Sequence, residues 1–448
     1  MHALLARAAE LAAQHRAGLA DRPVARPVDA AALRAGFGGP LPAHPTPPSD
    51  VLEQLARAAE PGLVATAGPR FFGFVVGGAL PAATAADVLA TGWDQNAFNA
   101  VLSPAAAAAE DVAGAWLKEL LGIPAGASVG FVTGGQAANT AGLAAARHHV
   151  LAEAGWDVER DGLTGAPRVR VVASEERHAT IDRALRLLGF GTRAVEPVKA
   201  GPQGAIDVGD LARVCAAGSG PLIVCLQAGN VNTGACDDLR AARAAAGGAW
   251  IHVDGAFGLW AAANPDTRAL LDGVELADSW ACDGHKWLNV PYDSGFVFCA
   301  RPDVHAAAIA YRAAYLTGAG EVSGMGDLTL ESSRRARGFA VWAALRELGR
   351  DGVAELVGRG CRLARRFADR LAEGGAEIAN DVVLNQVLVS FGDETDAVIR
   401  KVQDDGTCWL GGTTWRGRRY MRISVSGWAT TEADVDRSAA AIRRLAGQ

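Results

Sequence analysis

Short β-rich runs alternate with Ala-, Leu- and Arg-rich helical segments from about residue 70 to residue 310, and this alternation constrains the fold more than any other feature. Most of the runs are continuous apolar segments, which is typical of strands buried on both faces of a parallel sheet. Strands that alternate with helices indicate the α/β class, here a three-layer domain with a mostly parallel sheet. The predicted strands are Val129–Thr133, Val169–Ala173, Leu222–Leu226, Trp250–Val253, Ser279–Cys282 and Gly295–Cys299.

The segments on either side of this domain have a different character. Residues 1–69 predict a helical arm, which has little core of its own and should pack on another part of the molecule or on a partner subunit. Residues 311–448 predict a smaller α+β domain. A chain of 448 residues is long enough for these three parts, 1–69, 70–310 and 311–448. The predicted elements are helices over 1–35, 49–60, 334–348 and 353–373, strands over 382–391 and 419–425, and a last helix capped at Thr430 or Thr431.

Composition excludes several classes of protein. The net charge of −6 gives no basic surface for nucleic acid or anionic membrane, and no run of ~18 apolar residues predicts a membrane span. The first residues continue into a helical pattern and lack a signal-peptide layout. The seven cysteines are scattered without a CxxC pair, so we expect neither a metal site nor a disulfide framework. We expect a cytoplasmic location, where thiols stay reduced.

Lysine is rare in this Arg-rich chain, and Lys286 lies in the stretch 279–287, an apolar run that ends in the two basic side chains of His285 and Lys286. A guanidinium stays protonated, whereas an amine can be desolvated, deprotonated and made nucleophilic. Lys286 is therefore predicted to be a Schiff-base lysine; the alternative is a surface lysine at a strand end. The four lysines are Lys118, Lys199, Lys286 and Lys401.

Asp254 ends another predicted strand. A buried carboxylate needs a partner, and a protonated pyridine nitrogen is one; the alternative is a helix cap. Ala256, two residues on, would leave room for a flat ring. Lys286 follows Asp254 by 32 positions (286 − 254), about one helical crossover, so both side chains should project from the carboxyl edges of neighbouring strands, where open α/β sheets bind ligands.

Two further features fit a phosphorylated aromatic cofactor. Gly134 and Gly135 lead from a strand into a helix, and with Gln136 they could hold a phosphate at the helix N-terminus, although a plain turn is the alternative. His178 follows a strand and could stack on an aromatic ring; the alternative is an exposed histidine at the start of a helix.

Along the sequence, these features occur in the order phosphate loop, His, Asp and Lys. With this order the chain resembles fold-type I pyridoxal 5′-phosphate enzymes, and within them the group II amino-acid decarboxylases. The resemblance covers roughly residues 65 to 440. It implies that Lys286 forms the internal aldimine, that Asp254 pairs with the pyridine nitrogen and that His178 and Ala256 pack on the ring. It also implies phosphate contacts from Gly134, Gly135, Gln136 and His285. The matching stretches are Pro69–Gly73, Ser103-Pro104 with Glu110, Thr133–Asn139, His178, Gly229–Asp237, His252–Asp254, Asp283–Trp287 and Ser333–Arg335.

The resemblance further implies decarboxylation of an L-amino acid by a homodimer with shared active sites. Phe72, Phe74 and Trp93 suggest an apolar pocket for an aromatic or other bulky substrate; ordinary core packing is the alternative. Gln227 stands where relatives usually have a small hydroxyl residue.

The family usually protonates Cα from a loop tyrosine, and the corresponding segment, Thr317 to Ser333, has neither Tyr nor His. Tyr315, His178 or water could supply that proton. Otherwise oxidative decarboxylation–deamination, aldolase-type cleavage or transamination would follow. A non-enzymatic protein that binds a partner is a further alternative, disfavoured because the Lys, Asp and His are all present.

Overall fold

The computed structural model describes residues 1–311 and 324–447, which form two compact units. The large unit comprises Gly77–Ala364 and Asn380–Gln386, and the small unit comprises Met1–Val76, Arg365–Ala379 and Val387–Gln448. This division cuts the chain at other places than the predicted boundaries after residues 69 and 310. No helix in the described ranges is long and apolar enough to cross a membrane.

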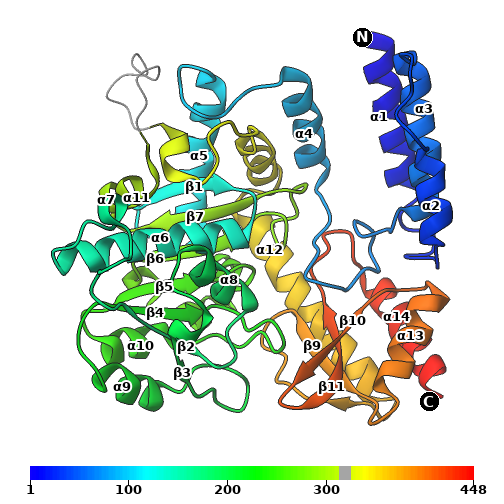
Figure 1. Ribbon diagram of the computed structural model, residues 1–448. Coiled ribbons are helices and arrows are strands. Elements are labelled where there is room, and N and C mark those ends of the chain that lie inside the picture. Colours follow the sequence, from blue (N-terminus) through cyan, green and yellow to red (C-terminus); the bar gives the residue numbers. More distant parts are fainter. Residues whose placement is uncertain (312–323, 448) are drawn as a thin grey trace. The chain divides into compact units, whose positions relative to one another are not determined.

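The core of the large unit is a seven-stranded sheet in the order β1-β7-β6-β5-β4-β2-β3 (Figure 1). The strands from β2 to β6 run parallel, and β7 is antiparallel to both β1 and β6. The predicted α/β class and mostly parallel sheet are therefore confirmed. The strands are β1 (Ser128–Val132), β2 (Arg170–Ser174), β3 (Val195–Val198), β4 (Leu222–Gln227), β5 (Trp250–Asp254), β6 (Ser279–Asp283) and β7 (Gly295–Cys299).

Helices cover this sheet, and α6 (Gly135–Glu153) is the most buried of them. Its sheet-facing residues are small, among them Ala138, Ala141 and Gly142, so the helix lies close against β5, β6 and β7. Helices α8 and α11 pack along α6 (Figure 1). Besides α6, the α-helices that lie wholly within the large unit are α4 (Pro81–Trp93), α5 (Pro104–Leu121), α7 (Val158–Asp161), α8 (Ala179–Leu187), α9 (Val208–Ala216), α10 (Leu239–Ala246) and α11 (Pro302–Ile309).

The small unit contains a smaller antiparallel sheet in the order β10-β11-β9-β8. Thr431, one of the two predicted caps, caps the last helix, α14, and forms a capping box with Asp434. The elements are β8 (Glu377–Ile378), β9 (Gln386–Ser390), β10 (Gly411–Trp415), β11 (Arg418–Ser424), α13 (Thr395–Asp405) and α14 (Glu432–Ala446).

One helix prediction needs correction. The arm does not begin with one helix over 1–35: α1 (His2–Ala17) and α2 (Ala30–Phe37) are separate, because Pro23 and Pro27 lack the backbone N–H that a helix interior needs. Helix α3 (Pro48–Ala59) follows, and none of the three helices has a buried residue. The two helices predicted over 334–348 and 353–373 are confirmed: the range α12 (Gly338–Ala372) consists of two helices that meet at Gly349, whose φ of 60° and ψ of −175° are not helical.

Candidate active site

Asp254 and Lys286 lie at the carboxyl ends of adjacent parallel strands. Asp254 is the last residue of β5 and is paired in register with Ala281 of β6, while Lys286 follows the end of β6 by three residues (286 − 283). This is the arrangement that the spacing of the two residues predicted. The carboxyl edge of a parallel sheet is where α/β proteins bind ligands.

Asp283 connects the lysine to the start of α6. Lys286 Nζ lies 2.9 Å from Asp283 Oδ2, and the backbone N–H of Gly135 donates to Asp283 Oδ1 across 2.5 Å. His285 Nε2 lies 3.4 Å from the same Oδ1. The Asp283 side chain is only 2% exposed. We did not single out this residue from the sequence, although a carboxylate ending a buried strand is the signal that identified Asp254.

The turn before α6 brings its backbone close to these side chains. A Cβ on Gly135 would lie 2.9 Å from Asp283 Oδ2, and one on Gly134 would lie 2.8 Å from His285 Cε1. The Asp283 carboxylate therefore lies at this helix N-terminus and accepts one of its free N–H groups, as an oxyanion bound there would. Gln136 Nε2 is directed away, 3.3 Å from both Thr140 Oγ1 and the carbonyl oxygen of Thr180.

Asp254 accepts hydrogen bonds from neutral donors. Asn139 Nδ2 donates to Oδ2 at 3.1 Å, and the N–H of Ala256 donates to Oδ1 at 3.2 Å. Thr180 Oγ1 lies 3.4 Å from Oδ2, but its single proton is directed to His178 Nδ1, at 2.8 Å, when that nitrogen is unprotonated. Within the described ranges no Lys, Arg or His forms an ion pair with this carboxylate, which is 6% exposed. A buried carboxylate without a cation is unfavourable, so a protonated pyridine nitrogen fits here.

His178 caps the start of α8 and lies beside Thr180. Its Nδ1 accepts the backbone N–H of Thr180 at 3.3 Å and lies 2.8 Å from Thr180 Oγ1. A nitrogen that accepts an N–H carries no proton, so the ring proton is on Nε2. Since Thr180 Oγ1 also reaches Asp254, the structure brings His178 and Asp254 to one place.

Gln227 ends β4 in register with Asp254, and its side-chain nitrogen is buried without a hydrogen-bond partner in the described part of the chain. An unsatisfied buried donor costs about 1–3 kcal/mol, so an acceptor on a bound ring would relieve it. This orphaned donor and the unpaired Asp254 both fit pyridoxal 5′-phosphate.

His285 lies on the phosphate side with its Nδ1 occupied. The backbone N–H of Ser294 donates to Nδ1 at 3.0 Å, and burial lowers the pKa of His285. Tyr292, which sequence reasoning missed, places its ring 4.6 Å from the His285 ring. Tyr315 and residues 317–323 of the loop lie outside the described residues, and Tyr311 Oη lies 2.5 Å from Ser332 Oγ.

The three aromatic residues of the predicted substrate pocket have different surroundings. In the small unit, Phe72 is buried edge-to-face against Phe367, and Phe74 is 65% exposed and stacked on Trp409. In the large unit, Trp93 is half exposed with its ring against that of Phe339. Packing against core neighbours accounts for Phe72, and the pocket stays a prediction.

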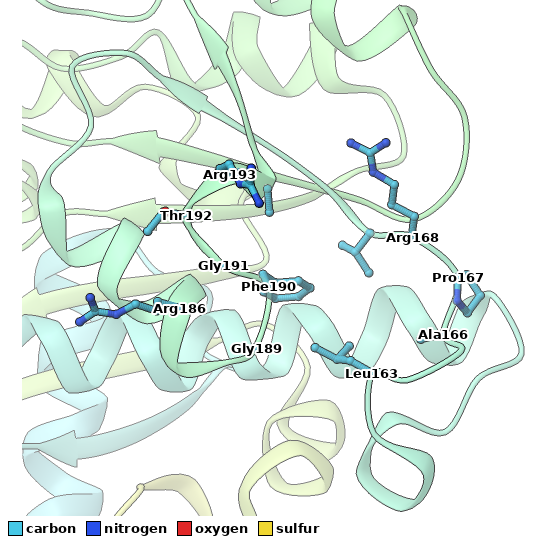
Figure 2. Close-up of a pocket in the computed structure, with 12 residues that line it drawn as sticks. Leu163, Ala166, Pro167, Arg168, Arg186, Gly189, Phe190, Gly191, Thr192 and Arg193 are labelled. Atoms are coloured by element: carbon cyan, nitrogen blue, oxygen red, sulfur yellow. The ribbon is translucent and has the colours of Figure 1, made fainter.

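A separate cavity of about 660 Å³ contains none of these residues (Figure 2). It is lined by Val169 and Ala194, which precede β2 and β3, so it lies at the opposite edge of the parallel sheet. The guanidinium groups of Arg168 and Arg186 do not converge on a common point in it (Figure 2). In the described residues, no three His, Cys, Asp or Glu side chains gather as metal ligands would.

Comparison with known proteins adds relatives at low identity. Tryptophan decarboxylase 1 from Oryza sativa subsp. japonica is 28% identical over 425 residues, covering 86% of this chain and 81% of that protein. Aromatic-L-amino-acid decarboxylase from Bacillus atrophaeus is 28% identical over 370 residues (80% and 75% covered). The 4-hydroxyphenylacetaldehyde synthase of Rhodiola rosea is 26% identical over 453 residues (94% and 90% covered).

The fold has close counterparts among solved structures. The crystal structure of Oryza sativa TDC with PLP and tryptamine superposes with a TM-score of 0.92 at 24% identity, covering 100% of this chain and 97% of that one. A family model described as the pyridoxal-dependent decarboxylase conserved domain matches residues 32–392. Because this match spans most of the chain, the protein belongs to the pyridoxal-dependent decarboxylases and is a carboxy-lyase that uses pyridoxal phosphate.

Proposed function

We propose that the protein decarboxylates an L-amino acid with an aromatic or other bulky apolar side chain, and that Lys286 binds the cofactor as a Schiff base. One observation carries this proposal: Lys286, the unpaired Asp254 carboxylate and the Gly134–Gly135 turn meet at one sheet edge. When bound, pyridoxal phosphate supplies the electron sink that stabilises negative charge after a bond at Cα breaks.

The chain's own residues divide the work of holding the cofactor. Gly135, Gln136 and His285 are the proposed phosphate contacts, and Asp254 receives the pyridine nitrogen. Ala256 and His178 are proposed to flank the ring, and Asp283 holds the Lys286 amine beside the phosphate cradle until the amine reacts. His178 Nε2 is the candidate donor toward Cα when the ring is an imidazolium, because a neutral imidazole is too weak an acid to give up its N–H proton.

A second candidate reaction, oxidative decarboxylation–deamination, is favoured by two specific observations. Residues 317–333 contain no Tyr or His, and an aldehyde synthase is among the relatives. In that reaction an amino acid, O2 and water give an aldehyde, CO2, ammonia and H2O2, so the carbon that loses CO2 is oxidised and oxygen is reduced.

A product assay across a panel of amino acids separates the two. The panel should include tryptophan, tyrosine, phenylalanine, glutamate and 2,4-diaminobutyrate, with Lys286→Ala as the inactive control and Lys401→Ala as the matched control. Amine and CO2 without peroxide would support simple decarboxylation. Equal amounts of aldehyde, ammonia and peroxide would support the oxidative reaction. Release of no CO2 from any substrate would contradict both, and release only from glutamate or diaminobutyrate would contradict the aromatic preference.

We infer in addition that the protein works as a homodimer. Helices α1 to α3 have no buried residues, and Leu5, Val51 and Leu55 on them are exposed. An apolar arm of this kind is expected to find cover on a second copy. Light scattering should give twice the monomer mass, and a concentration-independent monomer would contradict this inference.

A further inference from the structure

A continuous run of hydrogen bonds lies behind Asp254, within the large unit. Trp250 Nε1 donates to Ser279 Oγ at 2.9 Å, and Ser279 Oγ lies 2.9 Å from His252 Nδ1. His252 Nε2 lies 2.9 Å from Asn139 Oδ1, and Asn139 Nδ2 donates to Asp254 Oδ2 at 3.1 Å. All five side chains are buried; His252 and Ser279 are 0% exposed and Asn139 is 1% exposed.

The chemistry of the groups fixes the direction of this relay. An ionised carboxylate can only accept, so the Asn139 NH2 group faces Asp254 and Asn139 Oδ1 accepts from His252 Nε2. A neutral ring then has no proton on Nδ1, which accepts the Ser279 hydroxyl proton, while Ser279 Oγ accepts from the Trp250 indole N–H. Burial lowers the pKa of His252 to about 4, which keeps the ring neutral.

We propose that His252 is a positioning residue for the cofactor: by fixing the Asn139 amide, it keeps a hydrogen-bond donor on Asp254 Oδ2. This proposal rests on the proposed function, in which Asp254 receives the pyridine nitrogen. A flipped Asn139 would present its oxygen to the carboxylate, and Asp254 would favour its protonated form, which cannot pair with a pyridinium.

The local backbone is arranged around this contact. His252 and Asp254 are two residues apart on β5, so both side chains point to the same face of the sheet, where α6 lies. Helix α6 makes room for the imidazole at Gly142, where a Cβ would lie 2.7 Å from His252 Cε1. Gly142→Ala is therefore expected to displace the ring without removing any member of the relay.

The first test reads the relay in the protein without cofactor. Nitrogen-15 NMR of the histidine side chains should show His252 as the neutral Nε2–H tautomer between pH 6 and pH 8, values ~2 units or more above its lowered pKa. The signal is assigned by its loss in His252→Leu. A proton on Nδ1, or a charged ring at neutral pH, would overturn the relay.

The second test measures cofactor binding in matched variants. His252→Leu removes both hydrogen bonds and is expected to weaken pyridoxal-phosphate binding ~10- to 100-fold and to change the absorbance spectrum of the bound cofactor. His252→Gln keeps an N–H donor near the position of Nε2 and should recover binding to within about threefold of wild type. The control is His305→Leu: His305 is equally buried, and its Nδ1 lies 2.9 Å from Ser128 Oγ. It should lose stability but leave the affinity and the spectrum unchanged.

The outcomes separate this proposal from the proposed function. If His252→Leu binds the cofactor as His305→Leu does, the relay has no positioning role, while cofactor binding and CO2 release by the wild type would leave the proposed function standing. If the wild type binds no cofactor, both fail. Should His252→Leu not fold, Gly142→Ala takes its place, with weaker binding supporting the proposal and wild-type affinity overturning it.

Discussion

Asp283 puts a carboxylate where the phosphate of the cofactor is proposed to bind. Asp283 accepts a hydrogen bond from the Gly135 N–H and forms an ion pair with Lys286 Nζ. It therefore occupies the anion site and also binds the reactive amine. A second anion at this helix N-terminus must share donors with Asp283 or displace it. The residue is therefore expected to weaken cofactor binding while keeping Lys286 in place.

Asp283→Asn should tighten the binding of pyridoxal phosphate and of inorganic phosphate. The amide has the same shape without the negative charge, and a charge at a helix N-terminus is worth ~1 kcal/mol, or about fivefold in Kd. Fluorescence titration measures both ligands. The control, Asp303→Asn, removes a carboxylate from the first turn of α11. Unchanged or weaker phosphate binding in Asp283→Asn would contradict this account of the site.

His305 gives a pH dependence of stability that can be isolated by substitution. Burial lowers the pKa of His305 to about 4, below the ordinary value of 6.5, so the unfolded chain takes up a proton that the folded ring refuses. The stability from His305 is present above pH 6.5 and is lost as the pH falls toward 4. In His305→Leu, the decline of the unfolding free energy over this range should be shallower by up to ~3 kcal/mol. Parallel curves for the two proteins would show that the ring is not buried neutral.

Only some of the individual residues of the site could be predicted from the sequence. Lys286 and Asp254 were predictable because rare or charged residues at the ends of apolar runs stand out. Asn139 and Thr180 carry no such signal, since amides and hydroxyls are common on helices and their role depends on which strand they face. Only the folded backbone brings them to Asp254.

Among the elements, α5 depends on one buried ion pair. Arg334 donates to both oxygens of Glu110 at 3.0 and 2.8 Å and also to the carbonyl oxygens of Ala97 and Phe131. Its side chain is 0% exposed and that of Glu110 is 6% exposed. The pair therefore joins α5 to the end of the loop before α12 and to β1.

Glu110→Gln should destabilise the large unit by ~3 kcal/mol or more, because it leaves the buried Arg334 charge without a counter-ion. The matched control lies on the same helix: Glu119 pairs with Arg350, and both side chains are 61% exposed. Glu119→Gln should cost less than ~1 kcal/mol. Urea unfolding measures both, and equal effects would contradict a special role for the buried pair.

Some helices and strands could be predicted from the sequence pattern and others could not. Six strands were predictable because they are buried on both faces, whereas β3, with Glu196 and Pro197 and partly exposed, has no continuous apolar run. The break between α1 and α2 was missed because an Ala-rich pattern suggested continuity across two prolines.

For the whole molecule, the α/β class follows from the alternation of strands and helices, but neither the strand order nor the division into units does. Helix α12 contributes residues to both units, and the small unit combines both ends of the chain. Such a grouping depends on contacts between distant segments, which no local pattern records.

Removing the cofactor should lower the stability of the whole protein. Ligand at 100 times its Kd adds ~3 kcal/mol, so dialysis against a carbonyl-trapping amine should reduce the Tm by a few degrees, and added pyridoxal phosphate should restore it. Lys286→Ala should show a smaller rise on addition, and Lys401→Ala, on the exposed face of α13, should match wild type. An equal rise in Lys286→Ala would contradict a covalent contribution from this lysine.

Lys286 is proposed to hold the cofactor, and the scarcity of lysine makes this role directly testable. Borohydride reduction fixes a Schiff base to its lysine, and mass spectrometry of the digested protein then locates the added mass. We expect the label on the peptide that contains Lys286 and none on Lys118, Lys199 or Lys401. Label on any of those three, or an unlabelled Lys286 in protein that carries the cofactor, would contradict the account.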